Sequence, residues 1–355
     1  MTSAEPRAWV VRGGSRGESD QLFLRDSLVG LGFSEWGDLS AVSSREAMKA
    51  HALKVLPDAK PKSALSYAAQ AWAFRGRIAI GDHVVVPLKG SPHIAIGRVA
   101  GDYEYLSAPL GVIHHIRRVE WLRTDVPRTV VGSDLLYSIG AFSTVVQIQR
   151  NDAAYRIRVL AEADAEDPGA RPEVLPPSSD DTTAVDEDEL ADAAADSGFD
   201  IDAYVTDRIT ARIRERFDGH RLSALVGAIL EAEGFVVHVS PPGADGGVDI
   251  LAGRGVFGMD APRVVVQVKS EPKAVSDTVV AQLHGAVTRN SADQGLLVAM
   301  GGVTRQAEQQ LTGQKFRIAV WDSERLQRAI FDNYDALPAE IKADLPLRRA
   351  WILAE

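Results

Sequence analysis

The stretch from Glu162 to about Ile201 constrains this chain most, because it cannot join a folded core. It combines proline, serine and aspartate with few large apolar residues, so it buries too little surface to fold. Residues 161–203 carry 15 acidic residues and one basic residue, whereas the net charge of the whole chain is −10. The acidity is therefore local and does not argue against a nucleic-acid partner. We predict an acidic disordered linker over residues 161–201.

Length and composition fit two globular domains. The 355 residues suffice for two cores, and contents of 45% hydrophobic and 25% charged residues are ordinary. We predict domains over residues 1–160 and 202–335, with a tail over residues 336–355 to which no role is assigned. The lack of a signal peptide or long apolar run predicts a cytoplasmic protein without a membrane partner. The absence of cysteine excludes disulfides, thiolate zinc sites and a cysteine nucleophile.

Two predicted strands joined by a Gly-rich connection hold the candidate active site. Val248–Leu251 favours the first strand and Arg263–Lys269 the second. Alternate side chains of a strand share one face, so Gln267 and Lys269 point the same way. If the second strand returns antiparallel to the first, Asp249 lies next to that polar pair.

A carboxylate, a second oxygen ligand and a lysine are the minimum that metal-assisted hydrolysis of a phosphodiester requires. Asp249 is a hard oxygen ligand of the kind that Mg²⁺ prefers, and Mn²⁺ is an alternative ion. The metal would polarise the phosphate, and the ammonium group of Lys269 would balance negative charge or orient the attacking water. On spacing alone, a surface hairpin with a solvated lysine stays an open alternative.

The residues of this hairpin carry a family resemblance. The motifs G-x-D-G-G-V-D-I and V-V-Q-V-K resemble the nuclease core of the Mrr-type restriction endonucleases, a branch of the PD-(D/E)xK superfamily. Two later blocks, VVAQLHGAV and GLLVAMGGVT, extend the resemblance to roughly residues 205–335. It implies DNA cleavage with Asp249, Gln267 and Lys269 as catalytic residues, and with Asp249 and Gln267 as ligands of Mg²⁺.

Further residues are candidates for supporting roles around this site. Asp245 is expected either to support the site or only to fix the turn. The family often carries a glutamate within F-E-x-L-V on the second helix, whereas this chain has L-S-A-L-V with Ser223 at that position. This departure removes one carboxylate, although Ser223 could hold a water of the metal site instead. His220, next to the start of that helix, is a further polar candidate.

The N-terminal part reads as helices followed by strands. Apolar residues at helical spacing predict a helix from Gln21 to Phe33, and two more helices follow before Ile78. The runs GDHVVVPLK, HIAIGRVAGDYEYL and HHIRRVEWLRTDV then predict a small twisted barrel or half-barrel. Residues 72–105 resemble the PUA/EVE-like barrels, modules that hold a flipped or modified base in an aromatic-lined pocket.

Such a pocket would read an extruded base by stacking and by hydrogen bonds to its edge. The candidates for its wall are Trp36, Trp72, Phe74, Tyr103 and Tyr105. Trp36 and Tyr103 are the preferred two. The candidates for phosphate contacts are Arg75, Arg77, Lys89, Arg98 and, in the C-terminal domain, Lys273. The alternatives are that the aromatic residues belong to the core and that the cations are merely solvated.

These features predict α/β and α+β structure in two domains: an N-terminal PUA/EVE-like β-barrel with helices, and a C-terminal PD-(D/E)xK restriction-endonuclease-like fold. The resemblances imply a Mrr-like type IV (modification-dependent) restriction endonuclease acting on double-stranded DNA with modified bases. Cutting two strands needs two active sites, so a homodimer is expected during cutting. The alternatives are a non-cleaving protein that binds modified DNA through a degenerate nuclease domain, and a barrel that reads RNA.

Overall fold

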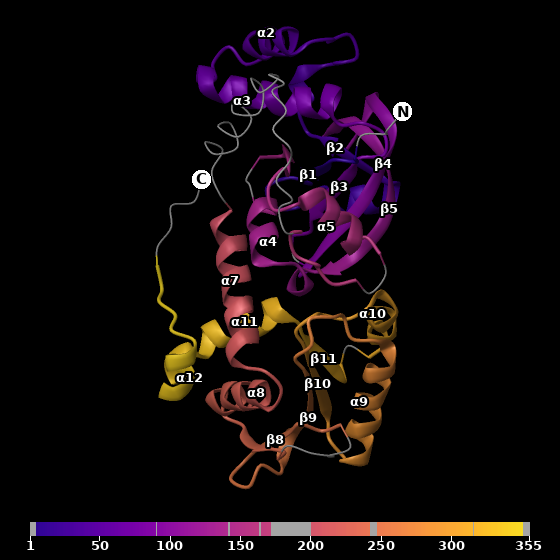
Figure 1. Cartoon of the computed structure of the whole chain (residues 1–355). Coiled ribbons are helices and arrows are strands. Elements are labelled where there is room, and N and C mark those ends of the chain that lie inside the picture. The colour runs from indigo at the N-terminus through magenta and orange to yellow at the C-terminus, as the bar shows by residue number, and fades with distance from the viewer. Residues whose placement is uncertain are drawn as a thin grey trace. The chain divides into compact units, whose positions relative to one another are not determined.

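The chain forms two compact units, each built around its own mixed sheet (Figure 1). Unit 1 extends to Tyr204 and unit 2 begins at Val205. The computed structural model describes residues 5–89, 91–140, 143–162, 165–171, 200–241, 247–314 and 316–350. The predicted two-part architecture of mixed helix and strand structure is confirmed. Within the described ranges, no helix is long and apolar enough to cross a membrane.

Unit 1 is organised around a six-stranded sheet in the order β2-β5-β4-β3-β1-β6. The pair β1 and β3 is parallel, and the other neighbouring pairs are antiparallel. The strands are β1 (Ala8–Val11), β2 (Leu28–Leu31), β3 (His83–Pro87), β4 (His93–Leu110), β5 (Ile113–Pro127) and β6 (Val145–Gln147). The helices are α1 (Asp20–Asp26), α2 (Arg45–Val55), α3 (Pro61–Trp72), α4 (Ser133–Ile139) and α5 (Ala153–Leu160). Short helical turns are η1 (Ser34–Trp36), η2 (Ala73–Arg77) and η3 (Arg128–Val130).

The sheet of unit 1 does not close into the PUA/EVE-like barrel that the sequence predicted. Its outer strands β2 and β6 do not pair with each other in the described part of the chain. Both faces of the sheet are instead buried in separate cores, because Trp9 and Val11 pack on one side while Ala8 and Val10 pack on the other. The second core includes residues of α4 and α5, so helices cover a face that a small barrel would expose to solvent.

The helix predicted from Gln21 to Phe33 is wrong in its second half. Helix α1 ends at Asp26, and Ser27 takes a left-handed conformation with φ of 52°. The following residues form β2, which pairs with β5 at the edge of the sheet. Gly30 permits this pairing, because a Cβ there would stand 2.4 Å from a side-chain carbon of Ile113. Pairing with a distant strand therefore overrides the helical spacing of the apolar residues.

Unit 2 is a five-stranded sheet in the order β11-β10-β9-β8-β7. The three strands β7, β8 and β9 are antiparallel neighbours, whereas β9, β10 and β11 run parallel. The strands are β7 (Val236–Val239), β8 (Ile250–Arg254), β9 (Asp260–Lys269), β10 (Gln294–Ala299) and β11 (Ile318–Trp321). The helices are α7 (Ile201–Arg216), α8 (His220–Ala232), α9 (Asp277–Arg289), α10 (Arg305–Thr312), α11 (Ser323–Asn333) and α12 (Ala339–Asp344), with a turn η4 (Tyr334–Ala336).

Helices cover both faces of the unit 2 sheet (Figure 1). Residues of α7, α8 and α11 form one core with Val264 and Val266 of β9. Residues of α9 and α10 form the other core with Val265. The alternation that the sequence predicted for β9 is therefore confirmed, and it places the odd-numbered residues of this strand on the α9 face.

Residues 165–171, which were predicted to begin the linker, contact unit 1. Arg156 is 1% exposed and its guanidinium pairs with Asp134 and Asp167, each at 2.6 Å. Asp167 also accepts a hydrogen bond from Gly132 N at 2.7 Å. Although burial opposes it, bonding to Arg156 holds the pKa of Asp167 below its ordinary value. The rest of the predicted linker, residues 172–199, lies outside the described residues, and the predicted domain limits stay predictions.

Replacement of Arg156 is expected to destabilise unit 1. Arg156→Ala leaves two carboxylates without their cation, one of them buried, and this should lower the free energy of unfolding by about 3–5 kcal/mol. Denaturation of the full chain, followed by tryptophan fluorescence, measures the loss. Arg158→Ala is the matched control, because Arg158 lies on the same helix and is exposed.

The destabilisation should depend on pH with a defined sign. Bonding to Arg156 lowers the pKa of Asp134, and the pKa of Asp167 is also lowered in the folded protein. Their contribution is therefore complete above the unfolded aspartate pKa of about 3.9 and is lost as the pH falls through the folded values. A difference between wild type and variant that does not shrink on acidification would contradict this account.

Candidate active site and ligand cavity

Asp249 lies at the open end of the β8–β9 pair. Ile250 of β8 pairs with Val266 of β9 in an antiparallel register. One residue beyond that pair, Asp249 therefore lies opposite Gln267. The carboxylate oxygen Oδ2 accepts a hydrogen bond from Val268 N at 2.7 Å, and Asp249 N donates to Val266 O at 2.9 Å. The carboxylate is thereby fixed beside the strand that carries Gln267 and Lys269, in the arrangement that the sequence predicted.

Gln267 is a buried polar residue at the centre of this arrangement. Its side chain is 3% exposed, and its oxygen Oε1 has no hydrogen-bond partner among the described residues. Its nitrogen Nε2 faces Gly247, where a Cβ would stand 3.3 Å away. Lys269 follows on the same face at the end of β9, half-buried, and no described carboxylate pairs with it. The structure therefore brings together the three predicted residues.

The oxygen atoms of this site fit a divalent metal. A buried acceptor without a partner costs about 1–3 kcal/mol of desolvation, which a cation would offset. Carboxylate and amide oxygens are the ligands of Mg²⁺, which takes one or two carboxylates and keeps several waters. The described residues hold no group of three or more histidine, aspartate or glutamate side chains that could bind a metal. Asp249 and Gln267 would therefore be the protein ligands.

Asp218 is an acidic residue that contacts the residue directly after β9, and sequence reasoning missed it. Ser270, which directly follows Lys269, donates a hydrogen bond from Oγ to Asp218 Oδ1 at 3.1 Å. Gly219 N donates to the same Oγ at 3.3 Å. The only signal in the sequence is the D-G dipeptide before α8, because the partners lie 52 residues apart.

The supporting candidates have different surroundings. Ser223 is 3% exposed within α8, and His220 is exposed at the first residue of that helix. Asp245 lies outside the described residues. Neither Ser223 nor His220 carries a carboxylate. Neither of them therefore replaces the glutamate that the family resemblance leads one to expect at position 223.

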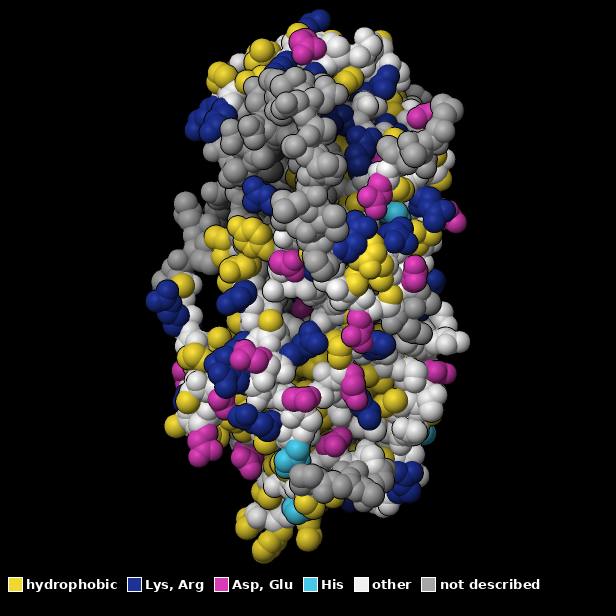
Figure 2. All heavy atoms as spheres, in the orientation of Figure 1, with side chains coloured by type: hydrophobic (Ala, Val, Ile, Leu, Met, Phe, Trp, Pro, Cys, Tyr) yellow, Lys and Arg dark blue, Asp and Glu magenta, His cyan; other side chains and the backbone are white. Residues whose placement is uncertain are grey.

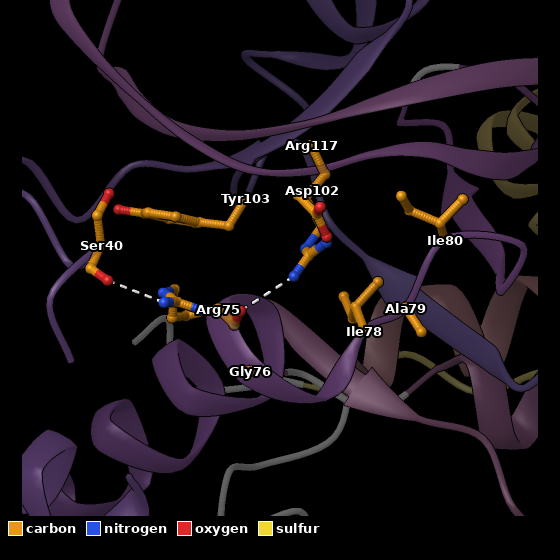
Figure 3. Close-up of a pocket in the computed structure, with 9 residues that line it drawn as sticks. All are labelled: Ser40, Arg75, Gly76, Ile78, Ala79, Ile80, Asp102, Tyr103 and Arg117. Atoms are coloured by element: carbon orange, nitrogen blue, oxygen red, sulfur yellow. Dashed lines mark hydrogen bonds between the residues drawn. The ribbon is translucent and has the colours of Figure 1, made fainter. Parts of the chain in front are cut away.

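Unit 1 contains a cavity of about 490 Å³ at the junction of η2 with β4 and β5. Figure 3 shows Arg117 extending from its strand to the turn that holds Arg75, and Tyr103 extending toward Ser40. The lining residues are Ser40, Arg75, Gly76, Ile78, Ala79, Ile80, Asp102, Tyr103 and Arg117. The cavity therefore combines an apolar strip with two cations, one carboxylate and one aromatic ring.

Arg117 is a buried cation of the cavity wall, and no sequence pattern singled it out. It is 2% exposed, and it donates to Phe74 O at 2.7 Å, Arg75 O at 3.0 Å and Gly101 O at 3.3 Å. Burial lowers the pKa of Arg117 to about 10, so the group stays charged at neutral pH. Carbonyl groups satisfy its donors, and the nearby carboxylate of Asp102 favours its charge.

Tyr103 is the predicted base-pocket residue that lines this cavity. His115 Nε2 bonds to Phe33 O at 3.1 Å and must donate there, so Nδ1 accepts from the Tyr103 hydroxyl at 2.8 Å. Leu39 N donates to the same hydroxyl at 3.2 Å, and burial raises the pKa of Tyr103 to about 12. The hydroxyl is thus fully engaged, and the Arg75 guanidinium lies 5.4 Å from the centre of the Tyr103 ring.

The other aromatic candidates do not line the cavity. Trp36 is 4% exposed and Phe74 is fully buried, each in a hydrophobic core, so the expectation that they stack on a base is wrong. Trp72 packs against the same small core as Trp36, and Tyr105 stacks on His114. Their apolar rings are used to join α2, α3 and η2 to the sheet, a role that sequence spacing does not distinguish from a pocket.

The predicted phosphate contacts are largely engaged within the chain. Arg75 donates to Leu39 O and Ser40 O, which fixes the loop at the cavity mouth. Lys89 pairs with Asp200 at 2.5 Å, and Arg98 lies 3.6 Å from Glu120. Arg77 and Lys273, the remaining candidates, also have interactions within the chain.

Two family models match the chain. Residues 214–330 match the Mrr_cat family, described as "Restriction endonuclease", and residues 9–139 match a domain of unknown function, DUF8426. No curated protein matches the chain. The C-terminal part is therefore a restriction endonuclease domain, which confirms this half of the predicted resemblance, whereas the PUA/EVE-like identity of the N-terminal part is not confirmed.

Three solved structures share weak similarity with the chain. A protein of unknown function, AF1548, has a TM-score of 0.24 at 15% identity, over 30% of this chain and 62% of that one. The MspJI restriction endonuclease in complex with a 27-mer oligonucleotide has a TM-score of 0.32 at 14% identity, over 95% and 71%. The DNA modification-dependent restriction endonuclease AspBHI has a TM-score of 0.32 at 14% identity, over 79% and 72%. Likenesses this weak carry no conclusion about activity.

Replacement of Gln267 is expected to raise the stability of the protein while it abolishes cleavage. Gln267→Met removes the unpartnered buried acceptor, so the free energy of unfolding in the absence of divalent ions should rise by about 1–3 kcal/mol. The same variant should lose DNA cleavage, because it lacks the amide oxygen. Thermal denaturation with a chelator and a cleavage assay measure the two effects.

Gln327→Met is the matched control for a buried glutamine. Gln327 is also 3% exposed, but its Nε2 donates to Thr206 O and Thr210 Oγ1. Its replacement should lower stability by a similar amount, because two acceptors lose their donor. If Gln267→Met and Gln327→Met destabilise the protein equally, Gln267 makes a stabilising contact within the protein, and its oxygen is not available to a ligand.

Proposed function

We propose that this chain is a Mrr-like type IV, modification-dependent restriction endonuclease that hydrolyses phosphodiester bonds of double-stranded DNA. The restriction endonuclease match of residues 214–330 supports the nuclease class. The observation that carries the proposal is the buried, unpartnered oxygen of Gln267 beside the carboxylate of Asp249. We assign Asp249, Gln267 and Lys269 as the residues that act on the phosphodiester, in a cytoplasmic enzyme.

Asp249 and Gln267 would hold one divalent ion, Mg²⁺ or Mn²⁺. When bound, such an ion supplies Lewis-acid polarisation of the phosphate and lowers the pKa of water. Lys269 has no described carboxylate partner, so its ammonium group is available to face the charge that develops on the phosphate. The hydrogen bond from Val268 N orients the carboxylate of Asp249 before any ligand arrives.

The cavity of unit 1 is proposed to select the target. Its volume of about 490 Å³ suits a small molecule or a nucleobase turned out of the duplex. Arg117 offers positive charge, Asp102 accepts hydrogen bonds, and the ring of Tyr103 provides a stacking face. The partner would be DNA with modified bases, cut by a homodimer with one active site for each strand.

A second candidate function is binding without cleavage. The buried Ser223 stands where related enzymes often carry a glutamate, and this leaves two oxygen ligands from the described protein. A degenerate nuclease unit of this kind would serve a reader of modified DNA, or of RNA, that depends on the unit 1 cavity alone. Cleavage assays in Mg²⁺ and Mn²⁺ distinguish this candidate from the first.

Lys269→Ala is expected to reduce cleavage by about 100- to 1000-fold while DNA binding persists, because it removes charge stabilisation from the transition state. Plasmids bearing methylated, hydroxymethylated or unmodified cytosine, incubated with Mg²⁺, provide the measurement. Lys342→Ala, on α12, is the control. Cleavage that survives in Lys269→Ala would refute the site, and absence of cleavage in the wild type with every substrate would favour the binding protein.

Tyr103→Ala is expected to weaken binding of modified DNA by about 1–3 kcal/mol through the loss of stacking. Tyr103→Phe keeps the ring, so it should retain affinity and lose stability through the unpaired Leu39 N–H. Tyr105→Ala, outside the cavity, is the control. Titration of labelled duplexes into the full-length variants measures affinity, and equal binding by Tyr103→Ala and wild type would exclude this cavity as the reader.

A further inference from the structure

Two irregular stretches of backbone line the cavity of unit 1. At the end of α3, η2 is a helical turn of the wide π type. On β4, three residues stand between the paired positions Val99 and Tyr103, whereas β5 has a single residue between the matching partners. Strand β4 therefore bulges at residues 100–102. Bulges and π-type turns are both frequent beside functional sites, and a bulge turns side chains away from the directions that a regular strand allows.

The bulge brings two consecutive residues of β4 to the same cavity. Neighbouring side chains of a regular strand point to opposite faces. Asp102 and Tyr103 nevertheless both line the cavity (Figure 3). Arg117 holds this arrangement, because its guanidinium donates to Gly101 O in the bulge and to two carbonyl groups of η2. The main chain that carries Asp102 is therefore fixed against η2.

Asp102 differs from the other polar residues of the wall because its hydrogen-bonding capacity is unused. The Tyr103 hydroxyl has a donor and an acceptor partner, and the Ser40 hydroxyl donates to a neighbouring carboxylate at 2.6 Å. Arg75 and Arg117 donate to main-chain carbonyl groups. Asp102 is exposed, and its charge favours that of Arg117. Within the described chain, however, its carboxylate has neither a hydrogen bond nor an ion pair.

A carboxylate accepts hydrogen bonds and cannot donate them. A ligand that covers Asp102 must therefore present a donor, because two acceptors that face each other are both left without a partner. The bases differ in this respect. Cytosine and adenine carry an exocyclic amine where thymine and guanine carry a keto oxygen. The wall of the cavity thus favours the first two bases and disfavours the others.

We propose that Asp102 determines the specificity of this cavity by accepting a hydrogen bond from the exocyclic amine of a bound base. Derivatives of cytosine and adenine are then the class of target, and bases with a keto oxygen at the corresponding position are excluded. The inference rests on the proposed function, because that function assigns selection of the target to this cavity. It adds the residue that decides and the chemical group that this residue reads.

Pairs of duplexes that differ only on the edge of one base test this role. 5-Methylcytosine and thymine, each placed opposite guanine, share their methyl group, and 5-hydroxymethylcytosine and 5-hydroxymethyluracil form a second pair. The wild type should bind the amine-bearing member about tenfold to hundredfold more tightly, although the mismatched keto base is easier to extrude. A duplex with adenine methylated on its amine distinguishes a purine target from a pyrimidine target. Titration of labelled duplexes into the full-length protein without divalent ions measures each affinity.

Asp102→Asn should reduce this preference to less than about threefold, because an amide also donates to a keto oxygen. Figure 2 shows acidic side chains scattered over the visible face of the molecule, so the general loss of a negative charge needs its own control. Glu104→Gln supplies it, since Glu104 is also exposed on β4 and does not line the cavity. This variant should keep the preference of the wild type, and thermal denaturation checks that both variants are folded.

Two results would overturn the role of Asp102 alone. One is equal affinity of the wild type for both members of each pair, with both bound more tightly than unmodified DNA. The other is a preference for the amine-bearing base that survives in Asp102→Asn. A wild type that binds modified and unmodified duplexes equally would instead refute selection of the target by the cavity, and this inference with it.

Discussion

The unpaired amide oxygen of Gln267 is the constraint on which the nuclease unit depends. Two cores, one on each face of the sheet, exclude water from β9 and leave this acceptor buried. A fold selected for stability alone would place an apolar residue at this position. Helices on both faces of the sheet offset this penalty, and the buried oxygen suits the cation that we propose for this site.

The cavity of unit 1 also has a buried polar side chain in its wall, but the hydrogen bonds of this one are made within the protein. Arg117 is buried among the main-chain carbonyls of η2 and β4, which satisfy its donors without neutralising its charge. The wall of the cavity therefore holds a buried cation with the carboxylate of Asp102 nearby. In each unit the sheet and its helices hold a buried polar side chain at the place where we propose that a ligand binds.

The two ends of the β8–β9 pair carry side chains that do not contribute to the hydrophobic cores. The open end of β8 and β9 presents Asp249 and Lys269, and the opposite end of the same strands presents the exposed apolar residues Val256, Phe257 and Met259.

The sequence alone determined the features that depend on short-range geometry. The period of two along a strand set Gln267 and Lys269 on one face, and the glycine-rich connection after Leu251 indicated a return strand. Only the tertiary structure decided the features that depend on pairing between distant segments. Pairing with β5 made residues 28–31 a strand, burial made Trp36 and Phe74 core residues, and the open sheet replaced the predicted barrel. The cavity joins η2, β4 and β5, and Asp218 meets Ser270 across 52 residues. Such contacts follow from strand register and sheet curvature, which no local pattern of residues encodes.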